Sequence, residues 1–422
     1  MFTPKLDKFP LFMMLSIRYN PTYRGIIKGT KVIPDTQSLR PANFTDKNMT
    51  YEFCVNNTEK LLRENISKIS AKNVAIGLSG GTDSSLNSLL LAKNEKVSLK
   101  LFCIGFNDSD DEFSDARLVA NLTNCDYKEI VLDDVTKDLP TLVWKFGSPK
   151  SNLWPYYNFK TVRELGAKTT LSGEGGDELF GGYYFRYVKY LKSKPLTSFF
   201  RAKKYVFSRP RDFVQNQLRM FGPKFKKDGK LVYTNDDIIK FFEPTFSNNL
   251  PFIKQIFLAD FNYKLRFDFN YVDLIFAKSE GVKVFSPFLE KNMLDFAPHI
   301  PTKFKITSNT SKIILRDILK RLGAPKRIYE KPKQGWGMRP TIVWERGLRE
   351  RCENFLLDGY LVRDDWINKK WIKDSLNKIS SSNESEIIYP IINKLWDLLS
   401  FEVFYIQYVL QQSKKGRISN WN

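Results

Sequence analysis

The chain has 422 residues, of which 42% are hydrophobic, so it can bury a large core and is not a disordered protein. Its formal net charge of +21 favours an anionic partner, such as a nucleotide, a nucleic acid, an acidic polymer or a membrane surface. The four cysteines are scattered without a C-x-x-C pair, and His299 is the only histidine. This composition excludes zinc-finger and histidine-based metal sites and argues against a Ser-His triad.

The N-terminal part of the chain is mixed in composition and punctuated by prolines. Its apolar patch at residues 9–17 is too short to span a membrane, because Arg18 ends it, and we expect a cytoplasmic protein without a membrane span. We expect residues 1–50 to form a short segment ahead of one large domain over residues 51–422. Residues 26–40 predict a short β-hairpin or meander with turns at Gly29 and at Pro34-Asp35.

A glycine turn between a strand and a helix is the first stretch that indicates chemistry. Apolar residues at helical spacing predict an amphipathic helix over residues 51–70, and the apolar run at 74–78 predicts a buried strand. The sequence SGGTDSS follows at 79–85, and a helix is expected at 86–92. Two glycines before a helix N-terminus are typical of a phosphate-binding loop, although no Gly-Lys-Ser/Thr of a Walker A loop is present.

We therefore predict that this loop binds phosphate through backbone N–H groups and hydroxyls, and that Asp83 holds Mg2+. The alternative is an ordinary capped helix after a tight turn. The predicted phosphate-binding residues are Ser79, Gly80, Gly81, Asp83, Ser84 and Ser85.

Strands and helices alternate after this loop. We expect strands at 99–106, 127–132 and 168–172, with helices at 114–122 and 158–165. This alternation predicts an α/β fold in which a parallel sheet has helices on both faces, followed by a mostly helical part from Tyr183 onward. Because ligands bind at the carboxyl ends of such strands, the loops at Ser79 and Ser172 should converge on one crevice.

The second chemical stretch is the acidic glycine loop LSGEGGDELFGGYY at 171–184. Its position after a strand predicts Glu174 as a general acid or base and Asp177 as a second Mg2+ ligand. An acidic turn that caps a helix starting near Glu178 is the alternative. Next along the chain, residues 186–232 hold 14 Lys or Arg against 2 Asp or Glu. This basic helical insert would be a solvated face, a docking site for an acidic partner or polymer, or an RNA-binding surface.

The two loops together resemble the synthetase domain of the asparagine synthetases and their relatives. These are PP-loop ATP pyrophosphatases, with an adenine-nucleotide alpha-hydrolase-like fold, that adenylate a carboxylate and then attack it with an amine. The resemblance covers roughly residues 51–405. Its further matches are Asp111-Glu112 with Ala116-Arg117, the segments 286–290, 311–316 and 331–336, Leu395-Trp396 and Phe401-Glu402.

The resemblance implies ATP and Mg2+ as cofactors. It places Leu78, Ser172 and Gly173 around the adenine and ribose, and it makes Lys312 and Lys333 cations for the leaving pyrophosphate. Lys333 would stabilise the transition state; the alternative is that it is one of many solvated lysines.

Departures from the family's pattern concern the nitrogen source and the acceptor. Phe2 stands where glutamine-dependent members have a nucleophilic Cys, and residues 23–41 resemble a remnant of the glutaminase domain, so we expect that this chain lacks a full glutaminase domain. Nitrogen would then come from free ammonia, a separate glutaminase or another amine. Altered residues at the expected amino-acid contacts indicate a changed substrate: Gly147, Leu274, Lys283 and Phe285.

Several functions remain open from the sequence. The first is an ATP-dependent amide-forming ligase of the asparagine synthetase type, acting on a small-molecule carboxylate. The second is a relative with a changed acceptor, which amidates a sugar acid or glycan or cyclises a peptide or β-lactam-type substrate. The third is an RNA-modifying PP-loop enzyme or RNA-binding protein, and a catalytically inactive scaffold is the last.

Overall fold

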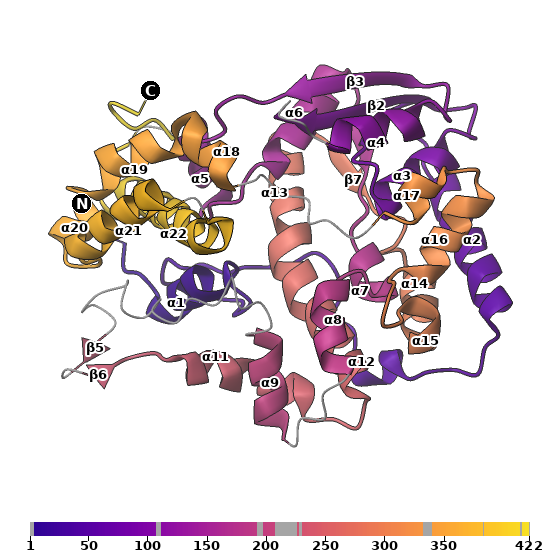
Figure 1. Cartoon of the computed structure of the whole chain (residues 1–422), viewed down its shortest axis with the longest axis horizontal. Coiled ribbons are helices and arrows are strands. Elements are labelled where there is room, and N and C mark those ends of the chain that lie inside the picture. Colours follow the sequence, from indigo (N-terminus) through magenta and orange to yellow (C-terminus); the bar gives the residue numbers. More distant parts are fainter. Residues whose placement is uncertain are drawn as a thin grey trace.

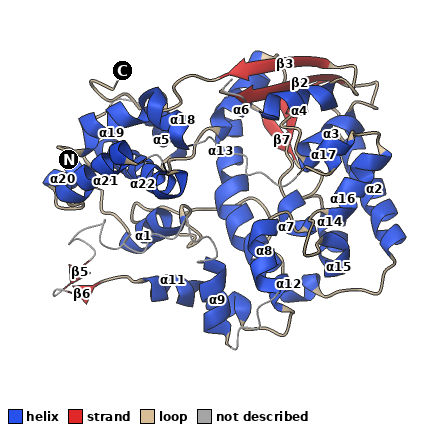
Figure 2. Ribbon diagram, in the orientation of Figure 1, coloured by secondary structure: helices blue, strands red, loops and turns tan. Residues whose placement is uncertain are grey.

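A five-stranded sheet, in which every pair of neighbours is parallel, lies at one end of the molecule (Figures 1 and 2). The computed structural model describes residues 4–106, 111–191, 197–206, 226–227, 230–331, 340–382, 384–413 and 416–421. The strand order is β3-β2-β1-β4-β7. The strands are β1 (Asn73–Gly77), β2 (Ser98–Gly105), β3 (Asp126–Val131), β4 (Thr169–Leu171) and β7 (Lys283–Phe285).

The strand order reverses between β1 and β4, and this reversal positions the crevice. Strand β1 pairs with β2 on one side, where Val74 lies opposite Leu99, and with β4 on the other, where Val74 lies opposite Thr169. Connections that leave two adjacent parallel strands in opposite directions open a crevice at their carboxyl ends. The predicted parallel sheet is confirmed, and the edge strand β7 is an addition that the sequence analysis did not predict.

Helices cover both faces of this sheet. On one face α3 and α4 pack on the strands, and α2 and α16 pack on α3; on the other, α6 contacts β1 and α13 contacts β7. The predicted helix at 51–70 corresponds to α2. The bounds are α2 (Tyr51–Ser67), α3 (Thr82–Leu91), α4 (Asp111–Ala120), α6 (Pro155–Glu164), α13 (Asn270–Ser279) and α16 (Ile313–Arg321).

The C-terminal helices form a separate group that packs against α5 (Leu139–Phe146), a helix that the sequence analysis did not predict. The Glu402 carboxylate accepts hydrogen bonds from the backbone N–H groups of Tyr360 (2.7 Å) and Leu361 (2.9 Å). These bonds join the long helix α22, which carries Glu402, to the start of the short helix α20. The group comprises α18 (Pro340–Val343), α19 (Arg349–Leu356), α20 (Tyr360–Arg363), α21 (Lys369–Ser381) and α22 (Ser385–Phe404).

A long helical rod crosses the middle of the molecule and changes its hydrogen-bonding period on the way. It begins as α12 (Phe252–Ala259), continues as a π-helix over Asp260–Phe269, and ends as α13. Wide helical turns of this kind are frequent at functional sites. Further α-helices between the sheet strands and the C-terminal group are α7 (Gly176–Phe180), α8 (Tyr184–Leu191), α9 (Ser198–Val206), α11 (Asn235–Phe242), α14 (Lys291–Phe296), α15 (Thr302–Lys305) and α17 (Lys326–Tyr329).

The buried Asp260 carboxylate at the start of the π-helix makes an ion pair with Arg186 (2.6 Å). Both side chains are at most 5% exposed, so we expect Asp260→Asn to leave a buried guanidinium without its anion and to lower the free energy of unfolding by about 3–5 kcal/mol. Urea unfolding measures the change. The exposed pair of Lys370 and Asp374 supplies the control, Asp374→Asn, for which we expect less than about 1 kcal/mol. Equal effects of the two substitutions would contradict the prediction.

The N-terminal segment packs into the core through α1 (Lys8–Ile17), whose residues 10–15 are buried. The predicted hairpin or meander at 26–40 is confirmed only around Gly29, where the bridge Arg24↔Lys31 and the hydrogen bond from the Gly25 N–H to the Thr30 carbonyl (2.8 Å) close a short antiparallel turn. Residues 33–40 form no strand, and there Asn262 accepts a hydrogen bond from the Leu39 N–H (2.8 Å) and Arg266 donates to the Thr36 carbonyl (2.7 Å). Side chains of the rod thus bind the backbone at residues 36–39 in place of ladder partners.

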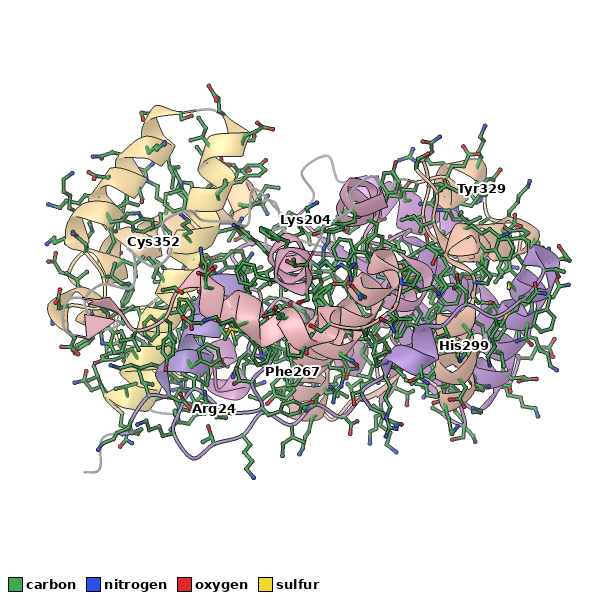
Figure 3. All side chains as sticks on the ribbon, turned by 90° about the horizontal axis from the view of Figure 1, so that it is seen from below. Arg24, Lys204, Phe267, His299, Tyr329 and Cys352 are labelled. Atoms are coloured by element: carbon green, nitrogen blue, oxygen red, sulfur yellow. The ribbon has the colours of Figure 1, made fainter. Side chains whose placement is uncertain are left out.

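Much of the basic insert at 186–232 lies outside the described residues, and β5 (Lys226–Lys227) and β6 (Lys230–Leu231) form a two-residue ladder within it. Figure 3 shows the molecule from below, with His299 and Cys352 in opposite halves. The four cysteines are free thiols. No helix in the described part of the chain is long and apolar enough to cross a membrane.

Candidate active site

The phosphate loop joins β1 to α3 with a turn that requires glycine. Gly80 has a φ of 66°, and a Cβ at this position would lie 2.4 Å from the Asp115 Cβ. The loop is further held by the Gly81 N–H, which donates to the Ser79 hydroxyl (3.3 Å), and by a contact of 3.2 Å between the Ser79 and Ser84 hydroxyls. Backbone and hydroxyl donors therefore gather at the start of α3, as a phosphate requires.

The acidic glycine loop after β4 lies directly against the phosphate loop. Asn87 on α3 donates to the Ser172 carbonyl (3.0 Å). A Cβ at Gly173 would lie 2.6 Å from the Asp83 Cβ, and one at Gly176 would lie 2.5 Å from its Oδ1. Glycine at both positions thus permits the close approach. The predicted convergence of the two loops on one crevice is confirmed.

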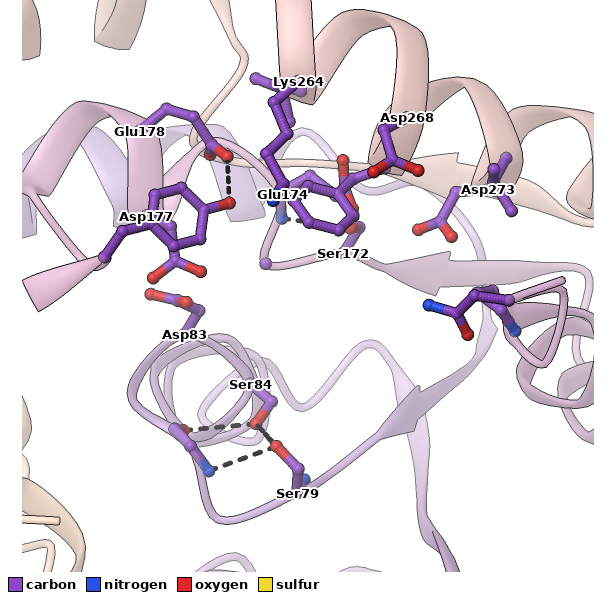
Figure 4. Close-up of a pocket in the computed structure, with 18 of the residues that line it drawn as sticks. Ser79, Asp83, Ser84, Ser172, Glu174, Asp177, Glu178, Lys264, Asp268 and Asp273 are labelled. Atoms are coloured by element: carbon purple, nitrogen blue, oxygen red, sulfur yellow. Dashed lines mark hydrogen bonds between the residues drawn. The ribbon is translucent and has the colours of Figure 1, made fainter. Parts of the chain in front are cut away.

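A buried lysine joins the two predicted metal-binding carboxylates. The Lys312 ammonium, on a residue that is 2% exposed, makes ion pairs with Asp83 and with Asp177 (2.6 Å to Oδ1). Figure 4 shows the carboxylates of Asp83 and Asp177 facing each other. Lys312 itself has a left-handed backbone conformation (φ 54°) at the start of α16, which aims its side chain at the loops. Two facing carboxylates are a suitable oxygen donor set for Mg2+.

The loops open into a cavity of about 520 Å³. Most predicted nucleotide-binding residues line it: Leu78, Ser79, Gly81, Asp83, Ser84, Ser172, Gly173 and Lys312, together with Glu174 and Asp177. Two do not. Gly80 forms the turn behind the surface, and Ser85 is buried with a hydroxyl that finds no hydrogen-bond partner among the described residues. Lys333 lies outside the described residues.

The half of the cavity beyond Glu174, which we call the acceptor half, is built from segments far apart in the sequence. The turn after α1 supplies Arg18 and Tyr19, the loop before α6 supplies Lys150, and the helical rod supplies Lys264, Asp268 and Asp273. The sequence analysis missed these residues as site residues, because no local motif marks them. The altered Lys283 and Phe285 do not line the cavity, and the Lys283 side chain is exposed.

Glu174 is held by its backbone and leaves its carboxylate to the cavity. Its N–H donates to the Ser172 hydroxyl (3.1 Å), and the Ser286 hydroxyl donates to its carbonyl (2.6 Å). The carboxylate atom Oε2 is buried and has no hydrogen-bond partner in the part of the chain that the structure describes. A buried acceptor in this condition is consistent with a catalytic group, or with one that a bound ligand, ion or water satisfies.

Burial and mutual repulsion raise the pKa of several carboxyl groups in this half. Burial raises the pKa of Glu174 well above its usual range, and the Asp273 charge is the next cause. Burial, followed by the charge of Asp268, raises the pKa of Asp273 to about 7. The pKa of Glu178 is also raised to about 7, by burial first and then by Asp177, although its hydrogen bond from Tyr183 opposes the shift. Glu178 and Asp273 are thus poised to exchange protons near neutral pH.

Lys331, at the last described position before Lys333, also lines the cavity and pairs with Asp115 (2.7 Å). Arg316 fixes this segment by donating to the carbonyls of Tyr329 (2.6 Å) and Lys331 (2.7 Å). The chain that leads to Lys333 therefore starts at the cavity wall.

Comparison with known proteins identifies the family of the chain. The family model described as asparagine synthase matches residues 58–405. Asparagine synthetase [glutamine-hydrolyzing] 1 of Bacillus subtilis is 24% identical to this chain, over 97% of the chain and 72% of its own length. A putative asparagine synthetase [glutamine-hydrolyzing] of Mycobacterium bovis is 26% identical over 68% of this chain and 48% of its own length.

Two solved structures overlap in part. The NH3-dependent NAD synthetase of Campylobacter jejuni has a TM-score of 0.24 and 17% identity, covering 32% of this chain and 61% of its own. The U34-tRNA thiolase NcsA of Methanococcus maripaludis has a TM-score of 0.31 and 13% identity, covering 85% and 87%. The family match spans most of the chain and both glycine loops, and the chain therefore belongs to the asparagine synthase family.

Proposed function

We propose that the protein is an AMP-forming carbon–nitrogen ligase, which adenylates a substrate carboxylate with ATP, releases pyrophosphate, and transfers ammonia or an amine to the activated acyl group. Membership of the family supports an ATP-dependent ligase. The observation that carries the proposal is the meeting of the two glycine loops, where Asp83 and Asp177 face each other across Lys312. This arrangement suits a reaction in which negative charge develops on a leaving pyrophosphate.

The first half-reaction needs donors and cations around the phosphates. Ser79, Ser84 and the loop N–H groups would bind phosphate oxygens, while Leu78, Ser172 and Gly173 would border the nucleoside. Asp83 and Asp177 would hold Mg2+, which neutralises phosphate charge when bound. The described residues contain no cluster of three or more His, Cys, Asp or Glu at metal spacing, so phosphate oxygens and water would complete the coordination, as is usual for Mg2+ with a nucleotide.

The second half-reaction needs a group that accepts a proton from the nitrogen nucleophile. Glu174 borders the acceptor half, its Oε2 is buried without a partner among the described residues, and its pKa is raised. A carboxylate with a raised pKa is a stronger base than an ordinary one. We assign Glu174 as the general base and propose Lys333 and Lys312 as the cations that stabilise the transition state of adenylation.

A changed acceptor is the second candidate, and the aromatic lining of the acceptor half favours it. Tyr19, Tyr205, Phe242 and Phe269 border the cavity there. Such an aromatic wall suits the body of a sugar acid or a peptide better than aspartate, which is short and carries two carboxylates and an ammonium group. Binding of an anionic polymer or RNA at the basic insert stays a prediction.

Pyrophosphate release identifies the acid. The purified chain is incubated with ATP, Mg2+, ammonium chloride and a panel of amino acids, uronic acids and peptides. Under the first candidate we expect release with aspartate, and under the second release with a larger carboxylate and none with aspartate. Release that is independent of any carboxylate would contradict the ligase proposal. Omitting Mg2+ should abolish release in every case.

A further inference from the structure

We infer that Lys331 binds the triphosphate of the nucleotide as a further cation, and that Asp115 is the positioning residue that holds it beside the phosphate loop. The inference rests on the proposed function and deepens it, because it assigns two more residues to the binding of ATP. Neither residue belongs to the two glycine loops. The contacts that join them to the phosphate loop carry the inference.

Asp115 lies directly behind the turn of the phosphate loop. It belongs to α4, and a Cβ at Gly80 would lie 2.4 Å from its Cβ and 2.9 Å from its carbonyl carbon. Its carboxylate accepts a hydrogen bond from the Arg327 Nε–H (2.6 Å) and makes an ion pair with the Lys331 ammonium (2.7 Å). Arg327 belongs to α17, which contacts α4 (Figure 1). One carboxylate therefore joins the back of the phosphate loop to the segment that leads to Lys333.

The cluster of Asp115, Arg327 and Lys331 has two cations and one anion, so its formal charge is +1. The Arg327 side chain is 53% exposed, whereas the Lys331 side chain is 13% exposed and lines the cavity. Arg327 thus binds the carboxylate from the solvent side and shares in its neutralisation. The positive charge that remains faces the cavity through Lys331, where it attracts an anion.

Lys331 also has hydrogen-bond donors to spare. An ammonium group has three N–H donors, and Asp115 is the one partner of this ammonium that the described residues supply. By contrast, Lys312 is engaged by the two proposed Mg2+ ligands, and Arg316 directs its three guanidinium nitrogens at backbone carbonyls. One of these carbonyls is that of Lys331, so its backbone is held as well as its side chain. A cation fixed in this way loses little freedom when it binds a phosphate.

The alternative is that the cluster only packs α17 against α4. A packing role would depend on the contact of Asp115 with Arg327 as much as on its contact with Lys331. Its loss would also lower the stability of the fold without regard to the ligand. The two roles therefore differ in which ligands are affected and in which partner of Asp115 matters.

Titration calorimetry of the whole chain with ATP and Mg2+, without a carboxylate, measures the contribution of Lys331. We expect Lys331→Met to raise the Kd for ATP about 10- to 100-fold, as for the loss of a hydrogen bond to a charged group. Lys331→Arg, which keeps the charge, should recover most of the affinity. The Kd for inorganic pyrophosphate should rise as for ATP, whereas the Kd for adenosine, which has no phosphate, should not change. Glu330→Gln is the control, because this exposed neighbour pairs with Lys326 (3.8 Å) and should leave every Kd unchanged.

A double-mutant cycle tests the role of Asp115. We expect Asp115→Asn to raise the Kd for ATP about 10-fold, because a neutral amide holds the ammonium less firmly than a carboxylate does. The same substitution should have no further effect in the Lys331→Met background. Arg327→Met removes the exposed partner of the carboxylate and should change the Kd by only about 2-fold. A thermal unfolding scan establishes that each variant folds.

An unchanged Kd for ATP in Lys331→Met overturns the inference, and so does an equal rise in the Kd for adenosine. An effect of Asp115→Asn that persists in full in the Lys331→Met background refutes the positioning role and leaves packing of α17 as its explanation. The proposed ligase function fails by a different result, which is a wild-type protein that binds ATP but exchanges no pyrophosphate with any acid of the panel.

Discussion

We expect Asp83→Ala to lower ATP–pyrophosphate exchange about 10²- to 10³-fold, the scale found when a group that stabilises developing charge is removed. The Asp83 carboxylate meets Asp177 across the Lys312 ammonium, at the point where the two glycine loops touch. Its loss removes one of two proposed Mg2+ ligands and leaves the adenylation step without charge neutralisation. Exchange of labelled pyrophosphate into ATP measures this step alone, whatever the nitrogen source.

The control for Asp83 is a carboxylate in the same helical position elsewhere. Asp83 lies in the first turn of α3, and Asp236 lies in the first turn of α11 with an exposed side chain. Asp236→Ala removes the same interaction with a helix N-terminus but should leave exchange unchanged. A thermal unfolding scan establishes that both variants fold. Unimpaired exchange in a folded Asp83→Ala protein would refute the assignment of this loop.

The nucleotide half of the site, which the two glycine loops form, could be predicted because its geometry is encoded in local sequence. The left-handed turn at Gly80 and the close approaches at Gly173 and Gly176 each require glycine, and all lie within two short motifs. Parallel pairing then brings the motifs together, since both follow strands that are neighbours in the sheet. Local sequence and sheet topology were sufficient for this half.

The acceptor half could not be predicted in the same way. It combines the turn after α1, the loop at Lys150 and a π-helix, and nothing in the composition of residues 260–269 distinguishes a π-helical from an α-helical hydrogen-bond period. Strand β7 has three residues, too few to show an alternating pattern. The meander at 26–40 forms only around Gly29, because side chains of the rod, distant in sequence, bind the backbone of residues 36–39. In the acceptor half, in β7 and at residues 36–39, contacts between distant parts of the chain determine the local structure.

Glu174→Gln should separate the two half-reactions. The amide retains the shape of the side chain and cannot accept a proton, so we expect amide formation to fall about 10²- to 10⁴-fold, the usual contribution of a general base. The backbone contacts that hold the loop, to Ser172 and Ser286, do not involve the side chain and should persist. ATP–pyrophosphate exchange should therefore continue in the variant. Parallel loss of exchange and amide formation would contradict the assignment of Glu174 to the second step.

The pH dependence of amide formation by the wild-type protein is a second test of Glu174 as the general base. Burial and the charge of Asp273 raise the pKa of Glu174, so the group is protonated over a wider range of acidic pH than an ordinary glutamate. A protonated Glu174 cannot accept a proton, and amide formation should fall as pH decreases through this raised pKa. Glu174→Gln lacks the titrating group, and its residual rate should lose that part of the pH dependence. Exchange does not use Glu174 as a base, so its rate should not show this fall at acidic pH. The same fall in the pH profiles of both exchange and amide formation would place the titrating group in adenylation instead.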